Sequence, residues 1–385
     1  MIKLLNAYTT EIDDIHAALD EIFNQIDSAK LSRNSVGILS CYSEFMDTGI
    51  VAALCERLPF DVIGCTTLLS AADGKYDMYM LRLTVLTSDD ISFSTAFTAP
   101  LSGDDYKNPL ADAYAAGRAK LPGDPSLIIS LFPFMPTLSG ATLLDSFDKI
   151  CGGIPIFGTL ASDVTTDLQN CHVFWNKQSE KHAVAMLLLH GDVNPRFFMT
   201  SLPSRNIRKQ KAVVTDSDGC FLRKVNDMTL PEYLQSIGLL SGGADRVDAT
   251  SVPLMVDYGD GSPVALAIYH TAADGSVTCG GEMPEGVSFS VGAIDYEGIM
   301  ETAKATVTQA MACGKAGGLL MFPCITRYFM LAPNSEDEVQ LVADSIGDRI
   351  PYALTYSSGE ICPVYDENGK THNRFHSYTF VACVF

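Results

Sequence analysis

The chain has 385 residues, which is enough for two or three domains. Hydrophobic residues make up 47% and charged residues 19%, a composition that excludes an intrinsically disordered chain. The net charge of −20 disfavours binding to nucleic acid, because such proteins need a basic surface to displace counterions from phosphate. An anionic membrane surface is disfavoured for the same reason. We therefore expect neither a nucleic-acid partner nor a membrane partner.

The cysteines indicate a reducing compartment. There are 11 of them, scattered along the chain without any C-x-x-C pair, and most lie in apolar runs. Such thiols behave as small buried hydrophobic groups, and a disulfide scaffold would be denser. The first residues turn polar too soon for a signal peptide, and no apolar run approaches the ~18 residues of a membrane span. We expect a cytoplasmic protein.

Three segments of the chain show the same order of predicted elements: helix, strand, helix, strand, strand. The spacing of apolar residues distinguishes the helices from the strands. The first segment has helices over 11–30 and 47–58 and strands over 36–42, 61–67 and 79–86. The second has helices over 105–120 and 141–150 and strands over 126–132, 154–160 and 183–189. The third has helices over 297–313 and 336–346 and strands over 318–323, 350–356 and 378–385.

Short words recur at matching places in these segments. The second segment reads LFPFMP after its first strand and IPIFGTLASD after its second helix, whereas the third reads MFPCIT and IPYALTYSSGE. These matches indicate an internal duplication, with the first segment as a more diverged copy. The alternative is that any chain of alternating helices and strands shows such an order by chance.

The elements predict an α/β to α+β fold with mixed sheets covered by helices. Short strand–helix–strand connections favour parallel pairs, and the last strand of each segment could run antiparallel. Region 212–292 differs, because it reads as strands joined by glycine-rich turns, with one short helix that has Pro231 near its start. We expect two domains, over 1–200 and 201–385, with the boundary near 191–211.

Cys324 is the cysteine best placed for a site, because it ends the first strand of the third segment. Ligands of open α/β sheets gather at the carboxyl ends of strands. Arg327, three residues on, could lower the pKa of the thiol or bind an anion. A catalytic Cys324 would also need a placed base such as His376. A pocket-lining thiol and plain packing are the alternatives.

The loop TYSSGEICP after strand 350–356 holds the other candidates. Tyr356, Gly359 and Glu360 lie at a carboxyl strand end, where a glycine permits close backbone approach and a carboxylate could bind an ammonium group. The equivalent loop of the second segment ends with Asp163, and that of the first is GCTT. Turn chemistry alone is the alternative explanation.

A metal site is a weak alternative. Cys362, His372 and His376 could supply three zinc ligands, but their spacing is not a recurrent one. We expect no metal and no cofactor.

At these residues the chain resembles the FIST family, with FIST-N and FIST-C domains in tandem. The resemblance covers essentially the whole chain and is most specific in FPCITRYFML, YSSGEICP and FHSYTFVACVF, in that order. It implies a sensory domain that binds a small ligand, an amino acid or a relative of one. Many relatives carry fused output domains. We expect none here, so that a separate signalling partner would receive the signal.

Carried over position by position, the resemblance implies a set of ligand-binding residues. In the C-terminal domain these are Cys324, Arg327, Tyr356, Gly359, Glu360 and His376, and weaker counterparts in the N-terminal domain are Gly64, Thr66, Gly158 and Asp163. We assign Arg327 to a ligand carboxylate, because its planar fork suits a bidentate contact, and Glu360 to a ligand amine. An ion pair between Arg327 and Glu360 is an equal alternative.

Three functions are consistent with these residues. The first is a sensor without catalysis, the second is an interaction module that recognises a partner peptide, and the third is a thiol- or acid/base-dependent enzyme acting on a small metabolite.

Overall fold

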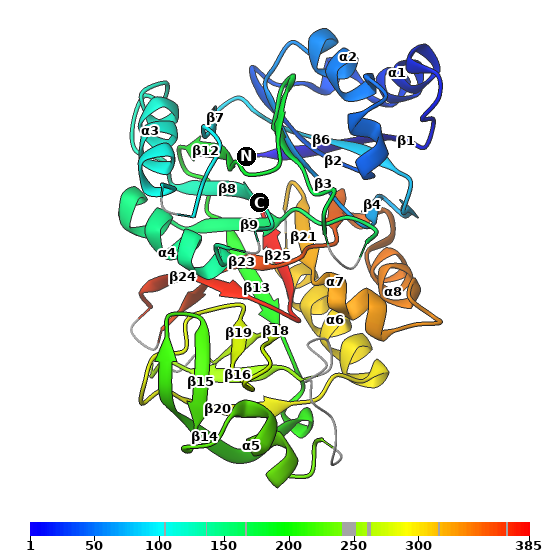
Figure 1. Ribbon diagram of the computed structural model, residues 1–385. Coiled ribbons are helices and arrows are strands. Elements are labelled where there is room, and N and C mark those ends of the chain that lie inside the picture. The colour runs from blue at the N-terminus through cyan, green and yellow to red at the C-terminus, as the bar shows by residue number, and fades with distance from the viewer. Residues whose placement is uncertain are drawn as a thin grey trace.

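The computed structural model describes residues 1–385 except 104, 136, 166, 167, 241–251, 260–262, 315, 367 and 368. In this described part, the strands form three six-stranded sheets and one seven-stranded sheet. Figure 1 shows the three six-stranded sheets together in the upper part of the molecule and the fourth sheet below them. The predicted fold of mixed sheets with helices is confirmed.

Unit one is the first of three similar units and spans residues 3–88. Its elements are β1 (Lys3–Thr9), α1 (Ile15–Gln25), β2 (Asn34–Cys41), α2 (Ile50–Arg57), β3 (Val62–Thr66), β4 (Ser70–Ala72), β5 (Lys75–Asp77) and β6 (Leu81–Ser88). Helix α1 begins later than predicted because Asp14 caps it, accepting hydrogen bonds from the backbone N–H groups of His16 and Ala17.

Unit two spans residues 92–190 and repeats this order. Its elements are β7 (Ser92–Phe97), α3 (Lys107–Arg118), β8 (Leu127–Phe132), α4 (Gly140–Cys151), β9 (Ile156–Leu160), β10 (Val173–Trp175), β11 (Gln178–Glu180) and β12 (Ala185–His190). Ser139 caps the start of α4, and Gly152 ends that helix in a left-handed conformation that suits glycine.

Unit three consists of residues 196–200 together with 296–384. Its elements are β13 (Arg196–Thr200), α6 (Tyr296–Met311), β21 (Leu319–Pro323), α7 (Ile325–Met330), α8 (Asp337–Ile346), β22 (Tyr352–Thr355), β23 (Glu360–Tyr365), β24 (Thr371–His376) and β25 (Phe380–Val384). Because β13 pairs antiparallel with β25, the two parts of this unit meet in one sheet.

The fourth sheet belongs to an insert within unit three, over residues 204–292. Its elements are β14 (Ile207–Asp218), β15 (Phe221–Val225), α5 (Leu230–Ser236), β16 (Leu254–Asp257), β17 (Val264–Leu266), β18 (Ile268–Thr271), β19 (Val277–Cys279) and β20 (Ser288–Gly292). Thr229 and Glu232 form a capping box at α5, with Pro231 in its first turn as predicted. The insert has a separate apolar core.

The three six-stranded sheets share one strand order: the first strand of a unit, its last strand, its two parallel strands, and then a hairpin. The orders are β1-β6-β2-β3-β10-β11, β7-β12-β8-β9-β23-β24 and β13-β25-β21-β22-β4-β5. The pairs β2–β3, β8–β9 and β21–β22 are parallel, and the last strand of each unit runs antiparallel, as predicted.

The hairpin in each sheet comes from another unit. Unit one extends the sheet of unit three with β4–β5, unit two extends unit one with β10–β11, and unit three extends unit two with β23–β24. Buried Arg82 of unit one fixes one of these crossings, because its guanidinium donates to the carbonyl oxygens of Ala71 and Leu354 and to Oγ1 of Thr355. The units are therefore linked in a closed cycle.

The inner faces of the three sheets form one shared core. Equivalent strand positions of the three units, Ile38, Ile129 and Leu320, all belong to it, and the rings of Phe157 and Phe322 stack there at 5.1 Å. The outer face of each sheet packs on helices of its own unit, in three further clusters. This arrangement places the carboxyl ends of the parallel strands near one another.

Sheet pairing crosses residue 200 in both directions, through β4–β22 and β9–β23. The division into domains over 1–200 and 201–385 stays a prediction. No helix in the described ranges is long and apolar enough to cross a membrane.

Candidate functional site

The carboxyl ends of β3, β9 and β22 converge, which brings predicted residues of both chain halves together. The carbonyl oxygen of Tyr356 accepts hydrogen bonds from the hydroxyl groups of Thr67 and Ser162, both at 2.8 Å. The backbone N–H of Ser162 donates to the carbonyl oxygen of Thr66 at 3.1 Å. These hydrogen bonds join the ends of the three strands, and they bring Thr66 and Tyr356 close together.

Asp163 and Thr66 hold the loop that follows β9. The buried carboxylate of Asp163 accepts from the backbone N–H of Thr165 at 2.6 Å and from that of Asn170 at 2.7 Å. The hydroxyl oxygen of Thr66 accepts from the backbone N–H of His172 at 2.9 Å. Both side chains are used to shape this loop before the chain enters β10.

Gly64 and Gly158 permit close packing in the middle of β3 and β9. A Cβ atom at Gly158 would lie 2.0 Å from the carbonyl oxygen of Ser130 on the neighbouring strand. At Gly64 it would lie 2.0 Å from the ring of Phe174, which belongs to the hairpin contributed by unit two. These glycines are needed for space rather than for an unusual backbone angle.

Gly158→Ala is expected to destabilise the fold by at least the ~1–3 kcal/mol typical of overpacking, since backbone atoms must move to admit the methyl group. The matched control is Gly103→Ala, where a Cβ atom would meet nothing within 4 Å. The urea midpoint of the far-UV circular dichroism transition measures both. Equal midpoints for the two variants would contradict the close packing at Gly158.

Arg327 is a buried member of an ion pair with Glu338. Its Nη2 lies 2.6 Å from Glu338 Oε1, and its Nε donates to the same oxygen at 2.8 Å. Nη2 also donates to the carbonyl oxygen of Ile299 and to Oγ1 of Thr302. The carboxylate partner of Arg327 is therefore Glu338 and not Glu360.

Tyr356 completes this buried network. Its hydroxyl donates to Glu338 Oε2 at 2.9 Å. Burial, followed by the negative charge of Glu338, raises the pKa of Tyr356 well above its usual value. Arg327, Glu338 and Tyr356 are each at most 1% exposed. Together they fix α7, α8 and the end of β22 to one another.

Glu360 lies apart from that network, at the start of β23. It is fully buried, and its Oε2 accepts from the backbone N–H and the hydroxyl of Thr379, at 3.2 and 2.7 Å. Among the described residues its Oε1 has no hydrogen-bond partner. Burial raises the pKa of Glu360 to about 8, so the neutral acid is the favoured form at neutral pH. Next to it in sequence, Gly359 makes room for the ring of Phe375.

Other polar groups surround Glu360. His376 lies directly opposite it on β24 and is 1% exposed, and its Nδ1 has no partner in the described part of the chain. Burial lowers the pKa of His376 to about 4, which keeps the ring neutral. Burial, followed by the charge of Glu360, raises the pKa of the Cys324 thiol strongly. A thiolate nucleophile at Cys324, which the thiol-dependent form of the enzyme alternative requires, is therefore disfavoured.

The side chains weighed as zinc ligands have other contacts. Nε2 of His372 lies 3.1 Å from Asp366, and Nε2 of His376 lies 3.4 Å from the carbonyl oxygen of Cys362. In the ranges that the structure describes, no three His, Cys, Asp or Glu side chains gather in a way that could hold a metal ion.

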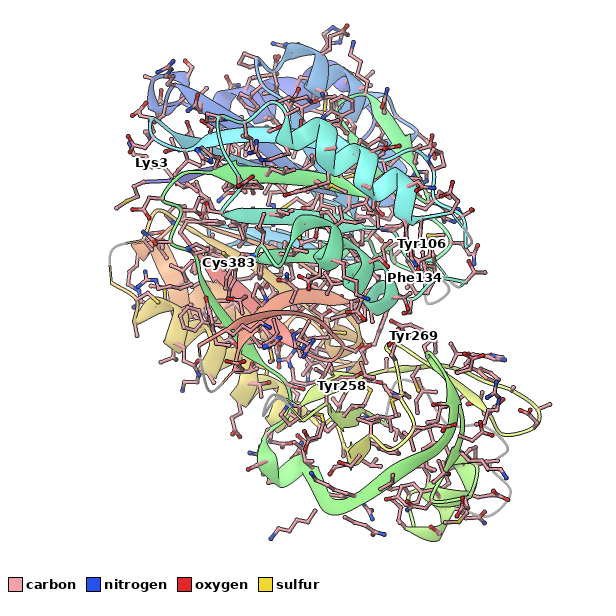
Figure 2. The ribbon with its side chains drawn as sticks, turned by 90° about the vertical axis from the view of Figure 1, so that its left-hand side faces the viewer. Lys3, Tyr106, Phe134, Tyr258, Tyr269 and Cys383 are labelled. Atoms are coloured by element: carbon pink, nitrogen blue, oxygen red, sulfur yellow. The ribbon has the colours of Figure 1, made fainter. Side chains whose placement is uncertain are left out.

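The insert contacts this region through aromatic side chains. Tyr269 of β18 packs edge-on against Phe134 of unit two, with ring centroids 6.2 Å apart. Tyr269 is 37% exposed, and loss of solvent around its hydroxyl, followed by the proximity of Cys324 and Glu360, raises its pKa. Figure 2 shows Tyr258 and Tyr269 on the side of the insert that faces the rest of the molecule. The cluster of Glu360, His376 and Cys324 thus lies beneath the insert.

A pocket of about 200 Å³ opens beside this cluster, between the insert, α4 and β24. We call it the junction pocket. Its lining residues are Ala141, Asp145, Tyr258, Val264, Leu266, Gly281, Glu282, Pro284, Asn373, Arg374 and Phe375.

The polar groups of the junction pocket are of both signs. The guanidinium of Arg374 lies 5.9 Å from the centre of the Tyr258 ring, and the hydroxyl of Tyr258 donates to the carbonyl oxygen of Glu282 at 2.7 Å. Asp145 and Glu282 are both exposed at the edge of the pocket, and partial loss of solvent around Asp145, followed by the charge of Glu282, raises the pKa of Asp145. A cationic group entering the pocket would relieve this repulsion between carboxylates.

The charged lining residues of the junction pocket were not candidates at the sequence level. Asp145, Glu282 and Arg374 lie far apart along the chain, on a helix of unit two, in the insert and on the contributed hairpin of unit three. Only the position of Arg374, two residues before His376, offered a signal.

Family models of two domains match the chain in tandem. The FIST N domain matches residues 35–228 and the FIST C domain matches residues 230–363. The chain belongs to the FIST family. FIST domains are small-ligand sensory domains of signal transduction. No curated protein matches the sequence.

The FIST domain matches include most of the residues discussed above. The FIST N match contains Gly64, Thr66, Gly158, Asp163 and the pocket residue Asp145. The FIST C match contains the network of Arg327, Glu338 and Tyr356, together with Cys324 and Glu360, whereas Arg374 and His376 follow its end.

Proposed function

We propose that this FIST protein is a cytoplasmic sensor that binds an amino acid or a related small metabolite in the junction pocket and signals to a separate partner protein. The observation that carries this proposal is the placement of a guanidinium and two carboxylates around one small pocket between the insert and the rest of the molecule. Arg374 would bind the carboxylate of the ligand, and Asp145 and Glu282 would bind its ammonium group.

The size of the junction pocket supports a small ligand. The junction pocket has a volume of about 200 Å³. This is less than the ~300–1,000 Å³ of pockets for drug-sized molecules. The volume suits an amino acid or a small acid and not a nucleotide.

The position of the junction pocket supports a sensory role. A ligand there would touch α4 of unit two, β24 of unit three and the insert at once. From Arg374, strand β24 leads directly to His376, which faces Glu360. The residues predicted from the family motifs would then form the buried layer beneath the ligand, through which binding changes how the insert is held.

Ligand binding is expected to raise the thermal stability of the protein. An amino acid present at 100 times its Kd would add about 2.7 kcal/mol to the free energy of unfolding. A thermal-shift screen of the 20 amino acids and of small carboxylic acids measures this effect. The shift should be lost in Arg374→Met, which removes the carboxylate-binding group, and kept in Arg118→Met, which alters an exposed ion pair with Asp124.

Two results would contradict the proposed function. One is the absence of stabilisation by every compound in the screen at millimolar concentration. The other is a full shift retained by Arg374→Met, which would place the ligand elsewhere.

A further inference from the structure

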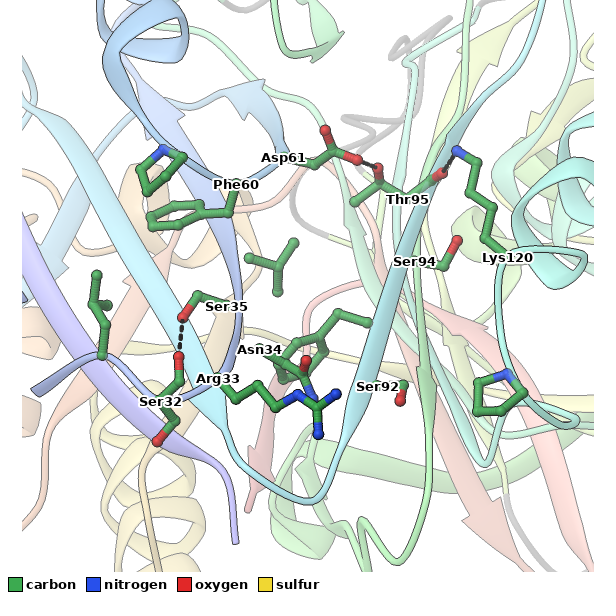
Figure 3. Close-up of a pocket in the computed structure, with 15 residues that line it drawn as sticks. Ser32, Arg33, Asn34, Ser35, Phe60, Asp61, Ser92, Ser94, Thr95 and Lys120 are labelled. Atoms are coloured by element: carbon green, nitrogen blue, oxygen red, sulfur yellow. Dashed lines mark hydrogen bonds between the residues drawn. The ribbon is translucent and has the colours of Figure 1, made fainter.

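A trough of about 550 Å³ lies between unit one and unit two, at the amino ends of β2 and β3. It is separate from the junction pocket and shares none of its lining residues. One wall is formed by residues 31–36 and 59–61 of unit one, and the other by residues 92–95 of β7 together with Lys120. Figure 3 shows these two walls facing each other. We call it the β7 trough.

Strand β7 is an edge strand that borders this trough. Among the described strands it pairs with β12 alone. The backbone N–H of Thr98 donates to Val184 next to β12, whereas the carbonyl oxygen of Thr95 accepts from Lys120 Nζ at 3.1 Å, away from β12. Because backbone directions alternate along a strand, Phe93 also directs its N–H and C=O groups away from β12 and towards the trough.

The equivalent junction between units three and one is closed. There the backbone N–H of Leu4 in β1 donates to the carbonyl oxygen of Gly317 at 3.1 Å. By strand register, Phe93 is the equivalent of Leu4 and Ser35 is the equivalent of Gly317. Phe93 and Ser35 are both described residues, and no such hydrogen bond joins them. They line the β7 trough instead.

The junction between units two and three has no backbone N–H donor at this position. The first strand of unit three starts at Arg196, and the residue equivalent to Leu4 is Pro195, which lacks a backbone N–H. Proline is one of the features that protect strand edges from pairing. Of the three equivalent strand edges, one is therefore bonded, one is blocked, and that of β7 opens into a trough.

Basic side chains line both walls of the trough. Arg33 is exposed on one side and Lys120 lies on the other, as Figure 3 shows. The carboxylate of Asp61 is engaged on both oxygens, by the hydroxyl of Thr95 at 2.6 Å and by the side-chain amide of Asn176 at 3.1 Å. In a chain with a net charge of −20, this is a local site that favours an acidic group.

We propose that β7 is the docking strand for an extended segment of a partner protein that carries an acidic side chain. The segment pairs with the free edge of β7, so that its carbonyl oxygen accepts the N–H of Phe93. On the opposite wall, the carbonyl oxygen of Ser35 accepts an N–H of the segment. Arg33 and Lys120 bind its carboxylate. A peptide backbone is the ligand that matches backbone donors and acceptors on both walls.

A displayed library of random heptapeptides, selected on the purified full chain, tests this proposal. The selected peptides should share an Asp or Glu, and a fluorescein-labelled one should bind in an anisotropy titration. Arg33→Glu should weaken binding at least tenfold, as should replacement of the acidic residue of the peptide by Ala. The control Lys209→Glu makes a similar charge change on an exposed residue outside the trough and should leave binding unchanged.

Hydrogen exchange of the unsubstituted chain provides a readout that does not depend on the variants. The bound peptide should slow exchange in residues 92–97. Failure to select peptides, binding that Arg33→Glu leaves unchanged, or protection confined to other segments would overturn the proposal. Sedimentation velocity tests whether a second copy of the chain occupies the trough instead of a partner segment. A dimer that Arg33→Glu dissociates would show this and would overturn the proposal.

Discussion

Replacing Arg327 by Met is expected to lower the free energy of unfolding by about 3–5 kcal/mol, because the substitution leaves the Glu338 carboxylate buried without its cationic partner. Arg327 is 1% exposed and Glu338 is fully buried. Met fills a similar length without charge, so loss of volume contributes little. Urea denaturation followed by circular dichroism measures the change.

Two further variants isolate the ion pair as the cause. Arg223→Met breaks an ion pair whose members are 42% and 41% exposed, and it should change stability by no more than about 1 kcal/mol. Adding Glu338→Gln to Arg327→Met removes the orphaned charge and should recover a large part of the lost stability. If Arg327→Met behaved like Arg223→Met, the network would not hold the fold, and Arg327 would be available to a ligand.

Glu360→Gln is expected to stabilise the protein by a few kcal/mol above pH 8 and to have little effect below pH 4.5. Burial raises the pKa of Glu360 from 4.5 to about 8 in the folded state. Between these values the folded protein holds a proton that the unfolded chain has lost, so the stability of the wild type falls as the pH rises through this window. Gln has the same shape and no charge to bury.

Titration of His376 changes the stability of the protein in the opposite direction and over a lower pH range. Burial lowers its pKa from 6.5 to about 4, so the unfolded chain binds more protons between these values and stability rises with pH there. The Glu360 effect is therefore read most clearly above pH 7, where His376 is neutral in both states.

Thermal melts of wild type and Glu360→Gln at a series of pH values from 4 to 9 measure the difference between the two proteins. Glu297→Gln on the exposed first turn of α6 is the control and should give a small, nearly constant difference above pH 6. If the wild type were as stable as Glu360→Gln at pH 9, burial of the ionised Glu360 carboxylate would not lower the stability of the fold, which would contradict this prediction.

Sequence patterns predicted the helices and long strands within each unit, but they did not predict the hairpins that join one unit to the sheet of another. The helices and the long strands of each unit carry clear apolar periodicity, which is why strands such as β8 and β21 were placed within a residue or two. The hairpin strands β4 and β10 have three residues each, too few for a pattern. Their partners lie in other units, so the closed cycle could not be deduced from local sequence.

The candidate site was predicted in part. Cys324 and Tyr356 directly follow the parallel strands β21 and β22, as the repeat predicted, whereas Glu360 is the first residue of the contributed strand β23. The partner of Arg327 could not be predicted, since Glu338 lies on α8 in a pattern typical of a surface helix. The junction pocket was missed because Asp145, Glu282 and Arg374 are brought together only by the insert and by the contributed hairpin.

The role of the junction pocket is tested most directly by a crystal structure of the full chain with the amino acid or small acid that raises its melting temperature most. We expect the ligand between the insert, α4 and β24, with its carboxylate on Arg374 and its ammonium group near Asp145 and Glu282. The Arg327–Glu338 ion pair should stay intact. A ligand bound beside Arg327 in place of Glu338, or outside the junction pocket, would contradict this assignment.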